Sequence, residues 1–405
     1  MNITDEQYQD LIYVAIKVTA RMDYRSIRKL LSAGVISCYR DLADFKRFKD
    51  LTSVDSALFS KIQSFISKEG LIRKVADGYA EIAVKNNIYT VSSLDKDYPY
   101  NFRVQSGMPQ VFFARGRREL LNNMTIYGSA CCVGARSASK YALYAAEKFS
   151  EELSKKMITI VSGMALGTDR SAHIGAIRNP GSTVAVLAGG CERIYPPDNR
   201  DIYEQLCTKG LILSEMPPGM QVLRQYFPSR NRLIAGLSDC CMIMEAGEIS
   251  GTLHTASFAA SQGKDVFVLP NSIYYDNARG GMKLLEDGAS VLLSPDNVID
   301  SIMQAILNRR LERPDLFENE KEVSPELMKN TEILRCRKKA DEDPESMSDE
   351  EWKVLIRDEL SSGPKDIDEL CRNIALPFYR LSRLVVSMQY SGIIGDENGK
   401  YALAV

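Results

Sequence analysis

The segment at residues 227–238, Phe-Pro-Ser-Arg-Asn-Arg-Leu-Ile-Ala-Gly-Leu-Ser, carries the residue types with the clearest potential for ligand chemistry. Two arginines and an asparagine follow an aromatic residue, and no acidic residue occurs from Met216 to Ser238. Because the whole chain has a formal net charge of −2, this cluster indicates a local anion site. The aromatic residue favours an anion that carries bases, since bases stack on aromatic rings. The alternative is a surface loop with scattered charge, which the lack of acidic residues disfavours.

Four residues of this segment are therefore candidate ligand contacts: Phe227, Arg230, Asn231 and Arg232. The two arginines lie in neighbouring quadrants if the segment is helical and on different sides if it is extended. Asn231 supplies both a donor and an acceptor. Arg224, a few residues earlier, adds a third positive charge.

Two turns between an apolar run and a helical stretch could complete such a site. At residues 132–137, Gly134 lets a phosphate approach the backbone, and Arg136 could bind that phosphate with two hydrogen bonds. Gly163 opens a second turn, where tight packing is the alternative to ligand contact. Asp169 and His173 follow it on a helix, and we expect a first-turn acid and a packed, hydrogen-bonded histidine.

Two further turns between an apolar run and a helical stretch also carry polar residues. In Tyr-Pro-Pro-Asp-Asn-Arg at 195–200, Arg200 could face the same crevice, and the aspartate or asparagine could cap the next helix. Ser250 and Gly251 begin another helical stretch and could bind phosphate or only cap the helix. Glu215 and Glu245 both end apolar runs, but no nucleophile or metal-ligand cluster accompanies them, so we expect them to hold loops by hydrogen bonds.

The composition excludes several classes of protein. The chain has nine cysteines but no Cys-x-x-Cys pair and only two histidines, so neither a metal nor another cofactor is expected. No run of about 18 apolar residues occurs, and the first residues lack the pattern of a signal peptide. We expect a cytoplasmic protein without a membrane span.

The elements that must position these residues follow a regular alternation after residue 98. Eight short apolar runs with helical stretches between most of them predict strands at 111–114, 130–133, 157–161, 183–187, 211–213, 240–244, 266–269 and 291–293. Continuous apolar strands alternating with helices predict an α/β fold with an extended, doubly wound and mostly parallel Rossmann-like sheet. Ligands of such sheets bind at the carboxyl ends of the strands, where the candidate turns lie.

Changes in residue pattern divide the chain into four parts. Residues 1–85 predict a helical, SAM-like domain, and residues 86–305 hold the α/β core. Residues 306–346 are charged and interrupted by prolines, which is typical of a linker. Residues 347–405 predict three helices and a hairpin around Asn398-Gly399, which is the plan of a winged helix.

The order of these motifs resembles the DNA-processing protein A family, also called DprA or Smf. The resemblance covers about residues 95–295 and rests on 133–136, 162–169, 195–200, 213–215, 227–238 and 250–253. It implies a Rossmann-like core without catalytic activity that binds single-stranded DNA and dimerises. It further implies that the protein protects incoming DNA in natural transformation and helps to load the RecA recombinase. On this basis the DNA contacts are Gly134, Arg136, Gly163, Arg200, Phe227, Arg230, Asn231, Arg232, Ser250 and Gly251.

Two other functions stay open at this point. A nucleotide N-glycoside hydrolase on a related fold would use Glu215 or Glu245, and a regulator would bind duplex DNA through the winged helix. The sequence departs from the family pattern at turns that border the crevice. Leu166 stands where a basic residue is usual, and Thr168 and His254 stand where isoleucine is usual. Asn271 replaces the glycine of a usual Pro-Gly-Ser turn, and Gly281 and Met282 replace the last two residues of a usual Gly-Thr-Asn turn.

Overall fold

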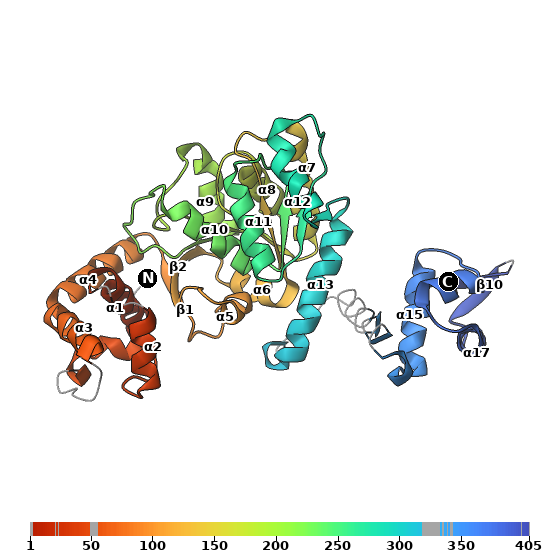
Figure 1. The fold of residues 1–405 in the computed structure, drawn as a ribbon, viewed down its shortest axis with the longest axis horizontal. Coiled ribbons are helices and arrows are strands. Elements are labelled where there is room, and N and C mark those ends of the chain that lie inside the picture. The colour runs from red at the N-terminus through yellow and green to blue at the C-terminus, as the bar shows by residue number, and fades with distance from the viewer. Residues whose placement is uncertain are drawn as a thin grey trace. The chain divides into compact units, whose positions relative to one another are not determined.

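The computed structural model describes residues 3–20, 22, 24–48, 56–317, 333, 336–337, 339–340, 343–397 and 399–404. The chain forms two compact units, Met1–Ile302 and Met303–Val405. Figure 1 shows the helices and strands of both units in the order of the chain. Within the described residues, no helix combines the length and the apolar character of a membrane span.

The first unit is built on one nine-stranded sheet with the order β1-β2-β6-β5-β4-β3-β7-β8-β9. Its strands are β1 (Tyr89–Ser92), β2 (Val111–Gly116), β3 (Ser129–Val133), β4 (Thr159–Ser162), β5 (Thr183–Val186), β6 (Leu211–Ser214), β7 (Cys240–Ile243), β8 (Val266–Val268) and β9 (Ser290–Val291). Every pair from β6 to β9 is parallel, whereas β1 pairs antiparallel with β2, and β2 with β6. The predicted fold class, an α/β protein with a mostly parallel sheet, is confirmed.

The strand order reverses at β3. From β3 the chain proceeds outward through β4, β5 and β6, and it then returns to place β7, β8 and β9 on the other side. In open α/β sheets such a reversal separates the loops that follow the two central strands and leaves a crevice. The turns after β3, β4 and β7 border this point, so the sheet topology itself brings the sequence motifs together.

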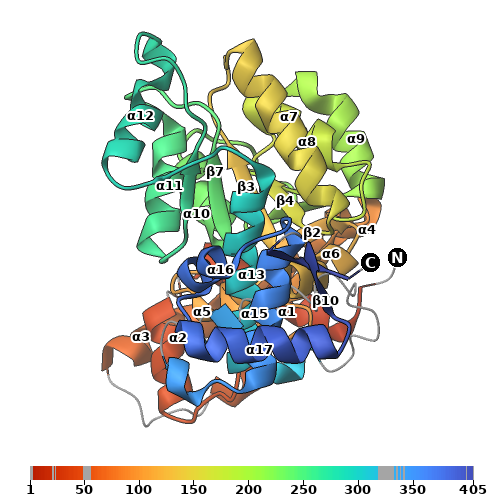
Figure 2. The ribbon, with the colours of Figure 1, turned by 90° about the vertical axis from the view of Figure 1, so that its right-hand side faces the viewer.

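Helices cover both faces of the sheet, as Figure 2 shows for α7 to α9 on one side and α10 to α12 on the other. The helices of this part are α5 (Tyr100–Val104), α6 (Glu119–Tyr127), α7 (Lys140–Lys155), α8 (Thr168–Ala176), α9 (Arg200–Lys209), α10 (Tyr226–Leu237), α11 (Gly251–Ser261), α12 (Arg279–Glu286) and α13 (Pro295–Glu312). Successive residues of β5 enter different cores: Ala185 packs with α9, whereas Val184 and Val186 pack with α10 and α11. Because both faces are buried, the central strands are continuous apolar runs.

The described residues before the sheet form the α-helices α1 (Asp5–Thr19), α2 (Tyr24–Ser32), α3 (Ser56–Ser67) and α4 (Glu69–Lys85). A capping box at Thr4 begins α1, since the Thr4 side chain accepts from the Gln7 N–H and the Gln7 side chain accepts from the Thr4 N–H. Apolar residues of these helices share one core with Phe113 of β2 and Ile212 of β6. The helices are thus packed against the sheet.

The second unit ends in three helices and a hairpin: α15 (Asp349–Ser361), α16 (Ile367–Ile374), α17 (Phe378–Tyr390), β10 (Ile394–Glu397) and β11 (Lys400–Leu403). Capping boxes at Ser348 and Asp366 begin the first two helices, as the sequence predicted. Asn398 of the predicted turn lies outside the described residues. Helix α13 continues to Glu312, within the predicted linker, and a winged helix stays a prediction.

Candidate functional site

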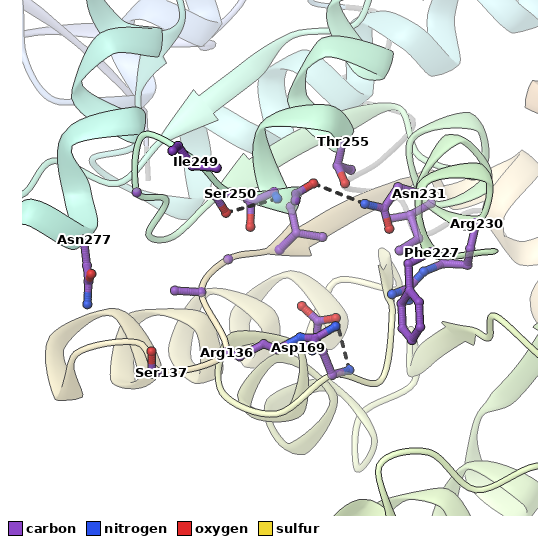
Figure 3. Close-up of a pocket in the computed structure, with 18 residues that line it drawn as sticks. Arg136, Ser137, Asp169, Phe227, Arg230, Asn231, Ile249, Ser250, Thr255 and Asn277 are labelled. Carbon is purple, nitrogen blue, oxygen red and sulfur yellow. Dashed lines mark hydrogen bonds between the residues drawn. The ribbon is translucent and has the colours of Figure 1, made fainter. Parts of the chain in front are cut away.

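A cavity of about 380 Å³ lies at the reversal point of the sheet. The turn after β3, the first turns of α10 and the amino end of α11 form its walls. In Figure 3, Ser250 and Ile249 lie on the side opposite Arg136 and Ser137, and Phe227 closes one end. The structure thus brings together Gly134, Arg136, Phe227, Arg230, Asn231, Ser250 and Gly251 from the predicted site.

Phe227 is the centre of an aromatic and cationic cluster at this end of the cavity. The guanidinium carbon of Arg136 lies 5.5 Å from the centroid of the Phe227 ring, and that of Arg230 lies 5.7 Å from it. Tyr195 approaches the same ring edge-on, with centroids 5.8 Å apart and an interplanar angle of 60°. Cations over a ring face hold that ring in place. The cluster therefore joins the turn after β3, the loop after β5 and helix α10.

A smaller cavity of about 120 Å³ lies beside this cluster. Its lining is mainly apolar and includes Leu166, Tyr195, Pro196 and Phe227, while Arg136 borders both cavities. Leu166, one of the departures noted in the sequence, contributes to this apolar lining. The two cavities together offer a polar space next to a slot lined by two aromatic rings.

Arg230 points into the protein instead of toward solvent. Its side chain is buried, with the residue 7% exposed, and Nη1 donates to the carbonyl oxygen of Val186 at 2.9 Å. The guanidinium passes under Gly163, where a Cβ would overlap the guanidinium and lie 2.7 Å from Nη2. Burial lowers the pKa of Arg230 to about 10. The structure thus gives Gly163 a packing role, the alternative that the sequence left open, and it packs the Arg230 guanidinium against Gly163 and β5 while the residue still lines the cavity.

Arg136 has the opposite character. It is exposed at the cavity, and among the described residues no carboxylate forms an ion pair with it. Gly134, two residues earlier, leaves room for Thr168, because a Cβ there would lie 2.5 Å from the Thr168 hydroxyl oxygen. That hydroxyl donates to the carbonyl oxygen of Ala135 at 3.2 Å. Gly134 and Thr168 together fix the turn that presents Arg136.

The amino end of α11 forms the opposite wall. The Ser250 side chain accepts from the Thr252 N–H and caps the helix, which confirms the capping alternative. Asn231 donates from Nδ2 to the carbonyl oxygen of Gly251 at 3.2 Å and so ties α10 to this wall. No atom lies within 4 Å of a Cβ built on Gly251, so the backbone there is open to the cavity. A helix N-terminus favours an anion at this point.

Gly163 lines the smaller cavity, and two predicted contacts, Arg200 and Arg232, lie outside both cavities. Arg200 borders a separate hollow beside Tyr195. Arg232 forms an ion pair with Glu215 on the far flank of α10, with Nη1 4.0 Å from the Met108 sulfur. The prediction that Asp198 or Asn199 caps α9 is wrong, because the Asn199 side chain makes no cap and instead donates to the carbonyl oxygens at 164 and 165.

Glu215 and Glu245 hold neighbouring segments through their carboxylates, as the sequence predicted. Glu245 accepts from both the backbone N–H and the hydroxyl of Ser139, the latter at 2.6 Å, and thereby anchors the turn before α7. Glu215 is engaged by Arg232. Neither carboxylate lines the main cavity. Sequence reasoning did not assign Ile249 or Asn277 to the site, although Ile249 directly adjoins the motif at 250–253. Tyr195 belongs to the turn at 195–200 that the sequence placed at the crevice, but it was not itself named as a ligand contact.

Asp169 and His173 are buried below the cavity. Asp169 accepts backbone N–H bonds from Gly163 and Ala165, both at 3.2 Å, which confirms its role as a first-turn acid. His173 Nδ1 lies 2.8 Å from the Thr183 hydroxyl, which itself donates to the carbonyl oxygen of Ile160. Nδ1 must therefore carry the proton and donate, and Nε2 has no hydrogen-bond partner in the described part of the chain. Burial, and secondarily the charge of Arg230, lowers the pKa of His173 to about 3.

This histidine predicts an acid-sensitive fold. Between pH 7 and pH 5, the unfolded chain binds a proton at His173 whereas the folded chain does not, so stability falls as the pH falls. From a pKa of about 6.5 in the unfolded state, we expect the free energy of unfolding to drop by about 2 kcal/mol at pH 5. Urea unfolding at both pH values measures this drop. His173→Gln should remove most of it and His254→Gln should keep it; an unchanged pH dependence in His173→Gln would contradict the assignment.

Within the described residues, no group of three or more histidine, cysteine, aspartate or glutamate side chains could hold a metal ion. The nine cysteines are all free thiols, and most of them are buried in the cores. The polar groups of the cavity are thus nitrogen donors, hydroxyls and amides, together with the buried Asp169. Such a set is suited to hold an anion through hydrogen bonds.

Comparison with known proteins agrees with this arrangement. The family described as DNA recombination-mediator protein A matches residues 89–303. Protein Smf from Synechocystis sp. is 33% identical over 309 residues, which are 75% of this chain and 77% of that protein. The X-ray structure of DNA processing protein A from Streptococcus pneumoniae is 28% identical, with a TM-score of 0.59, and covers 74% of this chain and 98% of that one. A structure of DNA processing protein A from Helicobacter pylori, solved to describe its single-stranded DNA binding mode, is 27% identical, with a TM-score of 0.48, and covers 54% of this chain and 96% of that one. This chain belongs to the DNA recombination-mediator protein A family.

Proposed function

We propose that the chain is a non-enzymatic protein that binds single-stranded DNA in the crevice. One observation carries the proposal: the Arg136 guanidinium borders both cavities at the point where the Phe227 and Tyr195 rings meet. A nucleotide needs a cation and donors for its phosphate and a flat apolar surface for its base. Here both kinds of surface adjoin within one crevice.

The size of the slot favours a single strand over a duplex. A cavity of about 120 Å³ between Tyr195, Pro196 and Phe227 has room for one small planar group. A base can enter such a slot only when it is unpaired and unstacked, which costs a few kcal/mol in a duplex. Single-strand binders use aromatic side chains in this way, at about 1–3 kcal/mol per base.

The wider role follows from family membership and the resemblance of the motifs. We infer that the protein protects incoming single-stranded DNA during natural transformation and helps to load the RecA recombinase onto it. A homodimer formed through the α/β core belongs to the same proposal. The names of the relatives, Protein Smf and DNA processing protein A, support a role in DNA processing.

The alternatives lack a supporting observation. A glycoside hydrolase needs a carboxylate at the ligand, but Glu245 and Glu215 are engaged with Ser139 and Arg232. Duplex binding through α17 needs available cations, but Arg383 pairs with Asp349 and Arg380 donates to the carbonyl oxygen of Met347.

The test is fluorescence anisotropy with single-stranded and duplex DNA at several salt concentrations. We expect a clear preference for the single strand and about a tenfold loss of affinity in Arg136→Ala, with a salt slope smaller by about 0.7. Arg178→Ala, an exposed arginine that borders none of these cavities, is the matched control. Equal binding of the two DNAs, or normal binding by Arg136→Ala, would overturn the proposal.

A further inference from the structure

A second and larger hollow, of about 780 Å³, lies elsewhere in the first unit. One wall comes from the amino-terminal helices and contains Lys17 of α1 and Arg28 of α2. The opposite wall comes from α5 and residues 105–110, and it contains Arg103. The hollow therefore depends on the packing of the helical part against the sheet. We call it the basic groove.

The charges of the basic groove favour an anion. Lys17 and Arg28 are exposed, and no carboxylate of the described residues forms an ion pair with either of them. Arg103 donates from Nη1 to the carbonyl oxygen of Ser93 at 2.7 Å. Glu215 is the one carboxylate in the lining, and its charge is balanced by Arg232. The groove thus carries net positive charge in a chain whose total is −2.

The sequence of α2 strengthens this field. Its nine residues, Tyr-Arg-Ser-Ile-Arg-Lys-Leu-Leu-Ser, include three basic side chains and no acidic one. Arg25, Arg28 and Lys29 are all exposed. Lys17 is held over the Tyr13 ring, with Nζ 5.7 Å from its centroid, which restricts the lysine to the groove side of α1.

The basic groove and the crevice flank the same helix. Asn231 lines the crevice (Figure 3), and the next residue, Arg232, holds Glu215, which lines the groove. The two sites are thus separated by α10, whose diameter with side chains is about 10 Å. Arg224 and Gln225, exposed just before α10, lie at the end of the helix that begins beside Phe227. A flexible chain could pass from one site to the other around this end.

The aromatic residues of the groove define what it would recognise. Tyr98 and Phe102 are among its lining, but they are only 4% and 2% exposed because they pack against Phe112. Their ring faces are not available to bases. Cations without available rings contact phosphates and carry no sequence information.

We propose that the basic groove binds the phosphate backbone of the same DNA strand whose bases occupy the crevice. This inference rests on the proposed function and extends it from a local pocket to a path that includes the amino-terminal helices. The crevice would hold bases and their phosphates, and the groove would hold only the continuing backbone. Affinity should therefore grow with strand length beyond the number of nucleotides that fill the crevice.

The experiment measures the affinity of oligothymidines from about 4 to about 16 nucleotides, the range that single binding modules cover. Lys17→Ala/Arg28→Ala should bind the shortest strand like the unmodified protein. For the longest strand we expect about tenfold weaker binding and a salt slope smaller by about 1.4, which is about 0.7 for each lost cation. Arg136→Ala should instead weaken binding at every length.

Lys85→Ala/Arg178→Ala removes the same two charge types from exposed positions outside both sites and should change neither length series. Circular dichroism should show both double variants folded, because all four side chains are exposed. Normal binding of the longest strand by Lys17→Ala/Arg28→Ala would overturn the groove and leave the crevice intact. A complete lack of single-strand binding in the unmodified protein would instead overturn the proposed function itself.

Discussion

Replacement of Gly167 by alanine is expected to lower the free energy of unfolding by about 3 kcal/mol or more, because two separate costs add. Gly167 has a φ of 75°, which side-chain-bearing residues rarely adopt. A Cβ at this position would also overlap the carbonyl oxygen of Arg136 and lie 2.6 Å from that of Ala135. Both obstacles are backbone atoms, so no side-chain rotation can relieve the overlap.

The same substitution should weaken DNA binding in the molecules that remain folded. The overlapped carbonyl groups belong to the turn that presents Arg136, so relief of the overlap must displace this turn. Urea unfolding and the anisotropy assay measure the two effects. Gly70→Ala in α4 is the control, since no atom lies within 4 Å of its Cβ and alanine is favoured in helices by about 0.5–1 kcal/mol. Unchanged stability in Gly167→Ala would refute the close approach of the two turns.

Much of the α/β fold could be predicted because burial on both faces produces an unmistakable pattern. All eight apolar runs overlap strands, although only Val291 of the run at 291–293 lies in β9. The turns after the parallel strands β3, β4, β5 and β7 meet at one edge of the sheet. The strand β1 was missed, since Tyr-Thr-Val-Ser at 89–92 is short and mixed in character. Among the described strands it pairs with β2 alone, at the edge of the sheet, and the Thr90 hydroxyl ties it to Asp10 of α1.

The sequence predicted which motifs form the candidate site, but it did not predict which of their side chains face the cavity. Whether Arg230 or Arg232 faces a ligand depends on the phase of α10, which begins at Tyr226. The phase also depends on the space above Gly163, which admits the Arg230 guanidinium. Such a choice is made by tertiary packing, and a local pattern of charges cannot decide it. The direction of Arg136 depends only on the local turn after β3, and the structure places this side chain at the cavity.

Replacement of Asp10 by alanine is the second change with a large expected effect. Asp10 lies in α1, is 1% exposed and accepts from the Tyr39 hydroxyl, Arg40 Nε and the Thr90 hydroxyl at 2.8, 2.8 and 2.9 Å. Thr90 belongs to β1, so these bonds join the amino-terminal helices to the sheet. Removal of one partner from a buried charged pair costs about 3–5 kcal/mol, because the other charge remains buried. We expect a loss near the lower end, since Arg40 keeps its ion pair with Asp95 at 3.1 Å.

Glu6→Ala provides the matched control, because Glu6 also pairs with Arg40, at 3.4 Å, but its side chain is 73% exposed. An exposed pair contributes about 0–1 kcal/mol, so urea unfolding should separate the two variants clearly.

The Asp10→Ala substitution should also change how DNA binding depends on strand length. Lys17 lies on the same helix as Asp10, so a loosened α1 moves one wall of the basic groove while the crevice stays in place. Folded Asp10→Ala should therefore bind short strands normally and lose the gain with strand length. Equal loss at both lengths would show that α1 supports the crevice rather than the groove.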